Sequence, residues 1–495
     1  MNKSAAIAAG VVIVVGALAT GGAWYTGQQL PGVLNESIAK GNQELTKAFA
    51  SSQYKGNIQL ESLESGLFSS TAHYRTTFQA LDENGQPHTL EMKFVDRIEH
   101  GPLPLSRLAS LKLLPVMAVS NLEVEKTPDT EKWFAMSNGK VPFTGRGSIG
   151  YDRSLNGHFE FAPLQYKDSD GEFAFSGLSF DTEASGDAEK LKVTGNMDNL
   201  QLNVQSPDGP VALQAKGMSF DSGGTKGKAG FYLGHSNVKI DQLVFQPVGR
   251  PAVQLEQFTN TNLMQEDADK LAAQVNYDIG KLSYSGKEIG AAHLGLRFGN
   301  LDVAATRSLY QLFQEKIVPA QQAAAAAEEP LELNLSAADQ ALLDAEMRKL
   351  LAGKPHIELE KFSLKTANGE SHAHLSIDLA DPGDFDQPQD ELVSKSLSQL
   401  SARVVLSKPM IQDIVGLQAS LQGVTDPKEI AEQGKAVSEM AAVMAQGMQL
   451  AKVEGDEIVS TLQYANDSVD FNGQKMTPEQ FMTFVMANSG MLGAQ

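Results

Sequence analysis

Apolar and polar residues alternate along much of the chain, as they do in β-strands with one buried face, but the alternation repeatedly slips by one position. Phe173 and Phe175 have the spacing of an ordinary strand. The next apolar residues, Leu178 and Phe180, fall in the opposite parity, so a regular strand would point them at the other face. The same apolar-x-apolar-x-x-apolar-x-apolar pattern occupies six segments: 159–166, 173–180, 213–220, 238–245, 277–284 and 357–364.

We interpret each slip as a β-bulge, which inserts one extra residue and returns the following apolar positions to the same face. Bulges also bend strands, so the six segments predict a long, curved antiparallel sheet with an apolar concave face. A tight turn between two short strands is the alternative interpretation of each gap. The residues expected to line the apolar groove are Phe173, Phe175, Leu178, Phe180, Leu213, Met218, Phe220, Tyr277 and Leu282.

The first 25 residues form a separate region, because residues 5–25 carry no charged side chain. A helix of this length spans ~30 Å, the thickness of the hydrocarbon core of a bilayer. We therefore expect a transmembrane anchor, with Lys3 on the cytoplasmic side and the rest of the chain outside. A cleaved signal peptide ending at Ala19 is the alternative. The expected membrane and interface residues are Ile7, Val11, Val15, Leu18, Trp24 and Tyr25.

The predicted fold class is α+β and β-dominated. It comprises an N-terminal transmembrane helix, a long curved antiparallel sheet of bulged strands and hairpins, and helices in the C-terminal half that pack on the sheet. The expected regions are a cytoplasmic tip at 1–4, the transmembrane anchor at 5–25, a stalk helix at 26–56, an extended β-rich domain at 57–302, and an α+β region at 303–495 that completes the body. Within the last region, helices are predicted at 336–351, 408–421 and 426–452.

Composition restricts the possible functions of this chain. The 495 residues include 40 Lys and Arg against 60 Asp and Glu, a formal net charge of −20, which disfavours nucleic-acid binding. The absence of cysteine excludes disulfides, Cys-ligated zinc and thiol catalysis. Residues 145–150 match G-x-G-x-x-G, but strand and turn residues follow where a dinucleotide fingerprint needs a helix. We therefore expect no cofactor, no metal site and no catalytic residues.

Several short stretches resemble one family. They are Gly-Gly-Ala-Trp-Tyr-Thr-Gly at 21–27, Gly-Leu-Phe-Ser-Ser at 66–70, His-Gly-Pro-Leu-Pro-Leu at 100–105, Leu-Gln-Tyr-Ala-Asn at 462–466 and Asn-Gly-Gln-Lys-Met at 472–476. Together they resemble the YdgA family of Gram-negative bacteria, whose function is unknown. The resemblance implies a single-pass inner-membrane protein with a cytoplasmic N-terminus and a periplasmic body, and it supplies no catalytic residues.

Three functions from different classes are consistent with these observations. The first is a non-enzymatic, membrane-anchored scaffold or interaction module of the cell envelope. The alternative is a carrier or chaperone for a lipid or another hydrophobic ligand, held on the concave apolar face of the sheet. A hydrolase with an unrecognised site is the third. The expected partners are the lipid bilayer, through the N-terminal helix, and envelope proteins or lipid, without nucleic acid.

Overall fold

The computed structural model describes residues 30–49, 54–66, 68–81, 87–102, 104–169, 171–206, 209–228, 230–327, 330–331, 333, 335–383, 385 and 387–492. The predicted transmembrane helix at 5–25, with its anchor residues from Ile7 to Tyr25, lies outside these ranges. Within them, no helix is long and apolar enough to cross a membrane. The predicted fold class is therefore corrected: the described chain is β-dominated, with a large antiparallel sheet and without a membrane-spanning helix.

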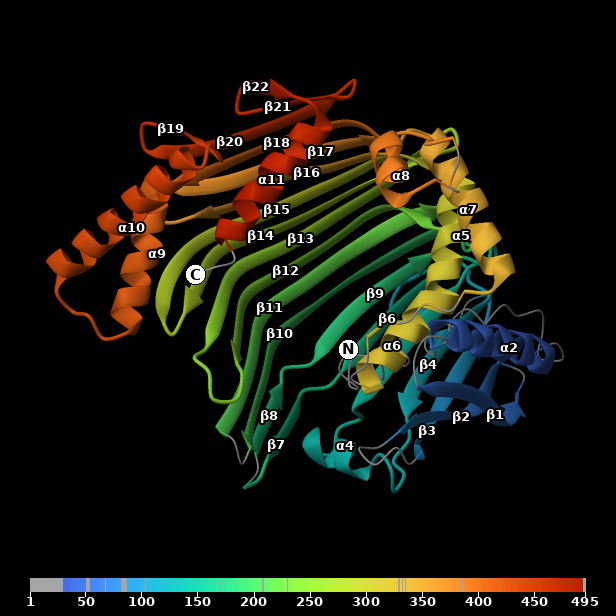
Figure 1. Cartoon of the computed structure of the whole chain (residues 1–495). Coiled ribbons are helices and arrows are strands. Elements are labelled where there is room, and N and C mark those ends of the chain that lie inside the picture. The colour runs from blue at the N-terminus through green and yellow to red at the C-terminus, as the bar shows by residue number, and fades with distance from the viewer. Residues whose placement is uncertain are drawn as a thin grey trace. The chain divides into compact units, whose positions relative to one another are not determined.

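The described residues form two compact units. Figure 1 labels the helices and strands of both. Unit 1 takes the described residues within Met1–Pro207, Leu213–Gly234 and Tyr310–Leu335, and unit 2 takes those within Asp208–Ala212, His235–Leu309 and Ser336–Gln495. Up to the end of β11 the elements are α2 (Leu30–Ala48), β1 (Lys55–Ser65), β2 (Ser69–Leu81), β3 (Pro87–His100), α3 (Leu105–Ala109), β4 (Ala118–Val124), α4 (Glu131–Met136), β5 (Phe143–Ile149), β6 (Leu155–Phe161), β7 (Leu164–Lys167), β8 (Gly171–Phe175), β9 (Leu178–Ala184), β10 (Lys190–Ser206) and β11 (Gly209–Lys226).

The second half of the chain begins with long strands and continues with helices between shorter ones. Its elements are β12 (Tyr232–Gln246), β13 (Val253–Asp267), β14 (Lys270–Tyr284), β15 (Lys287–Asp302), α5 (Val303–Leu312), the π-helix η1 (Phe313–Ile317), α6 (Val318–Ala327), α7 (Ala337–Ala352), β16 (His356–Lys365), β17 (Glu370–Leu379), α8 (Gln389–Ser396), β18 (Leu397–Ser407), α9 (Lys408–Leu421), α10 (Pro427–Gly447), β19 (Lys452–Glu454), β20 (Glu457–Ala465), β21 (Ser468–Phe471), β22 (Gln474–Met476) and α11 (Pro478–Leu492).

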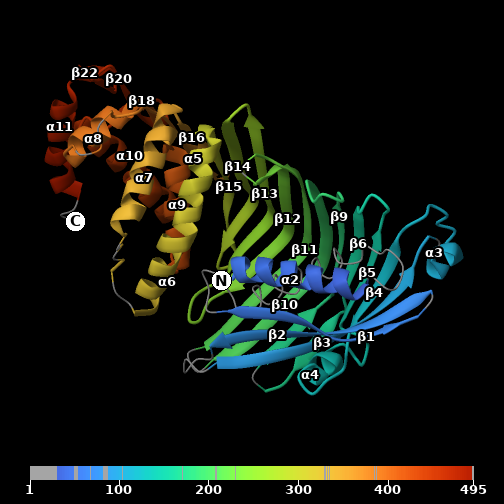
Figure 2. The same ribbon diagram turned by 90° about the vertical axis from the view of Figure 1, so that its right-hand side faces the viewer.

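The hydrophobic core of unit 1 lies between α2 and the sheet. Figure 2 shows α2 lying along β1 and β2, and its apolar residues Leu34, Ile38 and Leu45 are buried there. These positions are separated by four and by seven residues, which places them on one side of a helix. The helix predicted as a stalk is thus part of a packed core. Aromatic rings continue this core across the sheet, with Phe159 and Phe180 stacked at 5.0 Å between centroids.

The slip at 173–180 coincides with an interruption between two strands. Phe175 ends β8 and Leu178 begins β9, and both strands pair antiparallel with β10. The chain therefore continues in one direction through the gap, which excludes a tight turn. The register does not shift, since Phe175 pairs with Leu200 and Ser179 with Asn196. The bulge predicted here is wrong: a two-residue break, with Gly177 at a φ of 97°, takes its place.

Two other slips do contain the predicted bulge, and both lie in unit 2. The register of β14 against β15 shifts between Ile279 and Leu282. The register of β16 against β17 shifts between Leu359 and Phe362. In each case one strand carries an extra residue opposite its neighbour, as a bulge requires. In these two segments the pattern therefore correctly predicted a bulge.

Candidate hydrophobic binding face

One face of the sheet in unit 2 is apolar across several strands. Residues that pair directly across antiparallel strands share a face, so the registers define rows of neighbours. One row joins Tyr277, Leu294, Phe362, Ala373 and Val404, from β14 to β18. A second row holds Val275, Leu296, Leu359, Leu375 and Ala402, and a third holds Ala273, Phe298, Ile357, Ile377 and Leu400. We call these three rows the apolar face.

None of the side chains of the apolar face is fully buried. Phe362 is 56% exposed, and Tyr277 and Val404 are also exposed. A sheet face of this composition normally packs against a second layer, because apolar area left in water costs about 25 cal/mol per Å². A contiguous exposed apolar surface of this kind is typical of a binding site.

The bulge in β16 keeps the apolar face continuous. Leu359 pairs with Leu375, and Phe362 pairs with Ala373. Leu375 and Ala373 are two residues apart on a regular strand and share a face, so Leu359 and Phe362 share it as well. In a regular strand without the bulge, a residue three positions after Leu359 would point to the opposite side of the sheet.

The opposite face of the same strands is charged. His293 contacts Asp278 at 2.6 Å, and Lys281 contacts Glu256 at 3.0 Å. His356 Nδ1 lies 2.7 Å from Asp378 Oδ1, and this hydrogen bond raises the pKa of His356. Cross-strand ion pairs are typical of a face in contact with water. The sheet of unit 2 therefore has one polar face and one apolar face.

Two of the residues predicted to line a groove lie on the same side of the sheet as the apolar face, and of these two Tyr277 belongs to its three rows. They are Tyr277 and Leu282, since the β15 partners Leu294 and Gly290 have the same parity. The other seven lie in β8 to β11. Phe180 is buried in the core of unit 1, Leu178 and Phe220 pack against that core, and Phe173, Phe175, Leu213 and Met218 are half-buried. The structure therefore does not gather the nine residues into one groove.

Sequence reasoning missed Phe362, the most exposed aromatic side chain of the face. Phe362 stands in the segment 357–364, which carries the same slip pattern as 277–284. The pattern alone could have placed Phe362 beside Tyr277 in a set of lining residues. The sequence does not show that β14 and β16 both pair with β15, one on each side.

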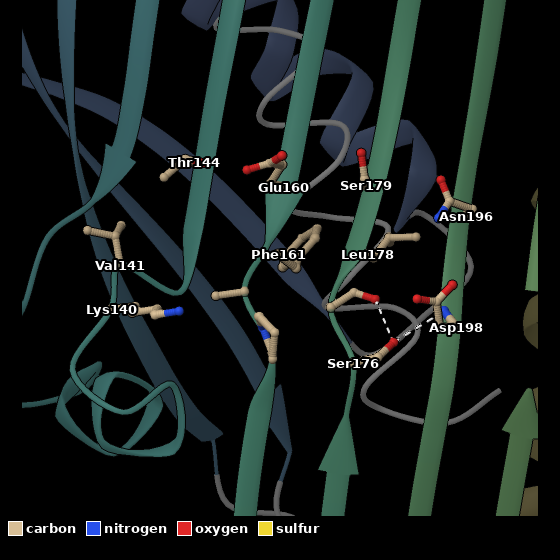
Figure 3. Close-up of a pocket in the computed structure, with 13 residues that line it drawn as sticks. Lys140, Val141, Thr144, Glu160, Phe161, Ser176, Leu178, Ser179, Asn196 and Asp198 are labelled. Carbon is tan, nitrogen blue, oxygen red and sulfur yellow. Dashed lines mark hydrogen bonds between the residues drawn. The ribbon is translucent and has the colours of Figure 1, made fainter.

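A separate pocket of about 430 Å³ lies in unit 1 (Figure 3). It forms where β6 gives way to β7 and β8 to β9, so two neighbouring strands are interrupted side by side. Its lining includes the charged residues Lys140, Glu160 and Asp198 and the apolar residues Phe161 and Leu178. This lining is more polar than that of most ligand pockets, which are predominantly apolar.

Ser176 lies in the break between β8 and β9 and lines this pocket. Its hydroxyl oxygen accepts hydrogen bonds from the backbone N–H groups of Asp198 at 3.2 Å and Asn199 at 2.9 Å. The hydroxyl also donates to the carbonyl of Gly177 at 3.3 Å. An activated serine needs a base that takes its proton, and here the hydroxyl instead bridges backbone groups. Across the described ranges, no group of three or more His, Asp or Glu side chains is placed to hold a metal ion.

Comparison with known proteins gives a family. The family model for a bacterial protein of unknown function (DUF945) matches residues 1–479. Protein YdgA of Escherichia coli (strain K12) is 27% identical over 97% of this chain and 96% of its own length. The uncharacterized protein YihF of the same strain is 26% identical over 96% of this chain and 98% of its own length. No solved structure matches. The resemblance seen in the short stretches is confirmed, and the chain belongs to the DUF945 family of bacterial proteins of unknown function.

Proposed function

We propose that this protein is a non-enzymatic binding protein of the bacterial envelope that holds a lipid or another apolar ligand on the apolar face of unit 2. The observation that carries the proposal is the row from Tyr277 to Val404, which crosses five strands and leaves Phe362 56% exposed. Acyl chains are long and narrow, and rows of half-exposed aliphatic side chains offer them a continuous contact surface.

The division of the sheet into two faces supports this function. Ion pairs such as Lys281 with Glu256 keep the polar face in water, so an apolar ligand has one face available to it. The envelope location rests on the sequence: an uncharged apolar segment at 5–25 suits export, and a chain without cysteine suits an oxidising compartment. A reporter enzyme that is active only in the periplasm, fused after Gln495, tests the location; a signal only from a cytoplasmic reporter contradicts it.

A binding titration tests the proposed ligand class. A fluorescent fatty acid whose emission rises in apolar surroundings is titrated into the purified chain. Phe362→Glu, which places a charge on the apolar face, is expected to weaken binding at least tenfold. Leu263 offers a matched control, because this exposed leucine pairs with Gln274 on the polar face. Leu263→Glu is expected to bind as the unaltered chain does, and equal affinities of all three proteins contradict the proposal.

An interaction module for another envelope protein is the second candidate. Met440, Val443 and Met444 of α10 are exposed on successive turns, and methionine-rich helix faces serve as adaptable protein contacts. Cross-linking in cells separates the two candidates. A photoreactive residue at Met440 that captures one protein, together with no lipid adduct at Phe362, favours the interaction module.

A further inference from the structure

Five leucines project into solvent from a short connection in unit 1. The connection between β3 and β4 contains α3, and residues 105–114 are called here the leucine loop. The exposed fractions of its leucines run from 38% for Leu108 to 83% for Leu111, and Leu105, Leu113 and Leu114 lie between these values. Figure 2 shows α3 beyond the ends of β3 and β4. Isolated exposed leucines are ordinary, but five within ten residues form a patch.

The backbone of the leucine loop holds these side chains outward. The carbonyl of Pro104 accepts the N–H groups of Arg107 at 3.0 Å and Leu108 at 3.1 Å. Lys112 N–H donates to the carbonyl of Arg107 at 2.9 Å, and the guanidinium of Arg107 donates to the carbonyl of Leu114 at 3.1 Å. The exposure of the leucines is thus fixed by a hydrogen-bonded structure.

The backbone conformation of Leu111 also indicates a functional role for the loop. Its φ is 55°, in the left-handed region where glycine or asparagine is usual and a leucine costs ~1 to 2 kcal/mol. Its side chain is also the most exposed of the five. A glycine would relieve the strain and remove apolar surface from water. A leucine at this position gains from a partner that buries its side chain.

The charge around the leucine loop is positive. Residues 100–118 include Arg107 and Lys112 and contain no Asp or Glu, in a chain whose net charge is −20. Lys112 is exposed among the leucines. Glu99, the acid that precedes this stretch, accepts the backbone N–H of Ser106 at 2.9 Å. Leucines interleaved with cations, without carboxylates, are complementary to a bilayer surface with anionic headgroups.

We propose that the leucine loop inserts its leucines into the surface of a lipid bilayer that carries anionic headgroups. A projecting connection fits this partner, because a bilayer surface accepts side chains of any pattern, whereas a protein partner needs a complementary groove. Phe68, also exposed, lies at the base of the loop, where its carbonyl accepts the N–H of His100 at 2.8 Å. The proposal goes beyond the apolar face and does not depend on it.

The absence of cysteine allows a local test in the full chain. Leu113→Cys introduces a single thiol, which is labelled with a dye whose emission rises and shifts to shorter wavelength in an apolar environment. Leu342→Cys, at an exposed leucine of α7, is the matched control. The labelled proteins are mixed with vesicles of phosphatidylglycerol and phosphatidylethanolamine, and separately with vesicles of phosphatidylcholine.

The dye at position 113 is expected to gain emission several-fold with anionic vesicles and to be quenched by lipids that carry a nitroxide on the acyl chain. The dye at position 342 is expected to change little. In the Leu113→Cys background, Lys112→Glu is expected to weaken the response to anionic vesicles at least threefold. If the dye at position 113 does not respond to anionic vesicles, or responds no more than the dye at position 342, the proposal is overturned.

Discussion

Leu359 and Phe362 lie on the same face of the sheet, although they are three positions apart on one strand. An odd separation places two residues of a regular strand on opposite faces. The bulge between them inserts the residue that restores the parity, and the register shift against β17 records it. The apolar face of unit 2 depends on this relationship, because Phe362 is its most exposed aromatic side chain.

Removing the extra residue should leave the apolar face of unit 2 intact. Deleting Lys361 places Phe362 two positions after Leu359, so a regular strand keeps both residues on the apolar face. We expect a loss of about 1 to 2 kcal/mol of folding free energy, measured by urea unfolding. Deleting Ser376 from the regular part of β17 turns Ile377 to the charged side of the sheet and should cost several kcal/mol. Equal losses in the two variants contradict the role of the bulge.

Gly177 should tolerate no side chain. Its φ is 97°, and a Cβ there would lie 2.7 Å from the carbonyl oxygen of Phe161. Gly177→Ala should therefore destabilise unit 1 by ~2 to 4 kcal/mol, the sum of backbone strain and a clash. Gly139, with a φ of 78° and open space around it, isolates the strain alone. Gly139→Ala should cost about 1 kcal/mol, and a cost equal to that of Gly177→Ala would show that the clash is relieved freely.

Asp96 should make unit 1 less stable as the pH rises. It is buried in the core, and burial raises its pKa from 3.8 to about 6, against hydrogen bonds from Ser120 and Asn121 that favour the charged form. The folded chain then binds more protons than the unfolded chain between these pKa values, so stability falls across that window. Asp96→Asn should abolish this fall and stabilise unit 1 at neutral pH by about 3 kcal/mol.

Urea unfolding at about pH 4 and about pH 7 measures the difference. The exposed Asp241 supplies the control, because Asp241→Asn should leave the pH dependence unchanged. A stability of Asp96→Asn that falls with pH as steeply as that of the unaltered chain would show that folding does not raise the pKa of Asp96.

The stability that His356 contributes should also depend on pH, in a higher pH range than that of Asp96. The hydrogen bond to Asp378 raises its pKa above 6.5, so its stabilising effect is fully present below pH 6.5 and lost as the pH rises through the raised value. His356→Gln should therefore lower the melting temperature at about pH 5.5 and leave it nearly unchanged at about pH 9. A decrease of the same size at both values would mean that His356 acts through packing alone.

The sequence predicts the local elements of this protein better than its long-range pairing. Ser336 begins a predicted helix and is the N-cap of α7, where its hydroxyl accepts the N–H of Asp339. The helix predicted at 408–421 is α9, capped by Ser407. Both depend on residues within one turn of the helix end, so neighbouring residues suffice to predict them.

The slips in alternation show which features neighbouring residues alone do not predict. The same pattern is a bulge at Leu359 and Phe362 but an interruption at Phe175 and Leu178, because the outcome depends on the neighbouring strand. β8 and β9 pair with β10 in a single register across the gap, whereas the register of β16 against β17 shifts by one residue. The pairing of the strands, which neighbouring residues do not determine, therefore distributes the predicted groove residues between unit 1 and the apolar side of the sheet in unit 2.

Photocross-linking in living cells tests the apolar face most directly. A photoreactive amino acid replaces Phe362 on the apolar face or, as the control, Leu263 on the polar face, and adducts are identified by mass spectrometry after purification. Lipid adducts at position 362 and none at position 263 are the predicted result. Equal lipid adducts at both positions, or none at position 362 in a folded protein, would contradict the account.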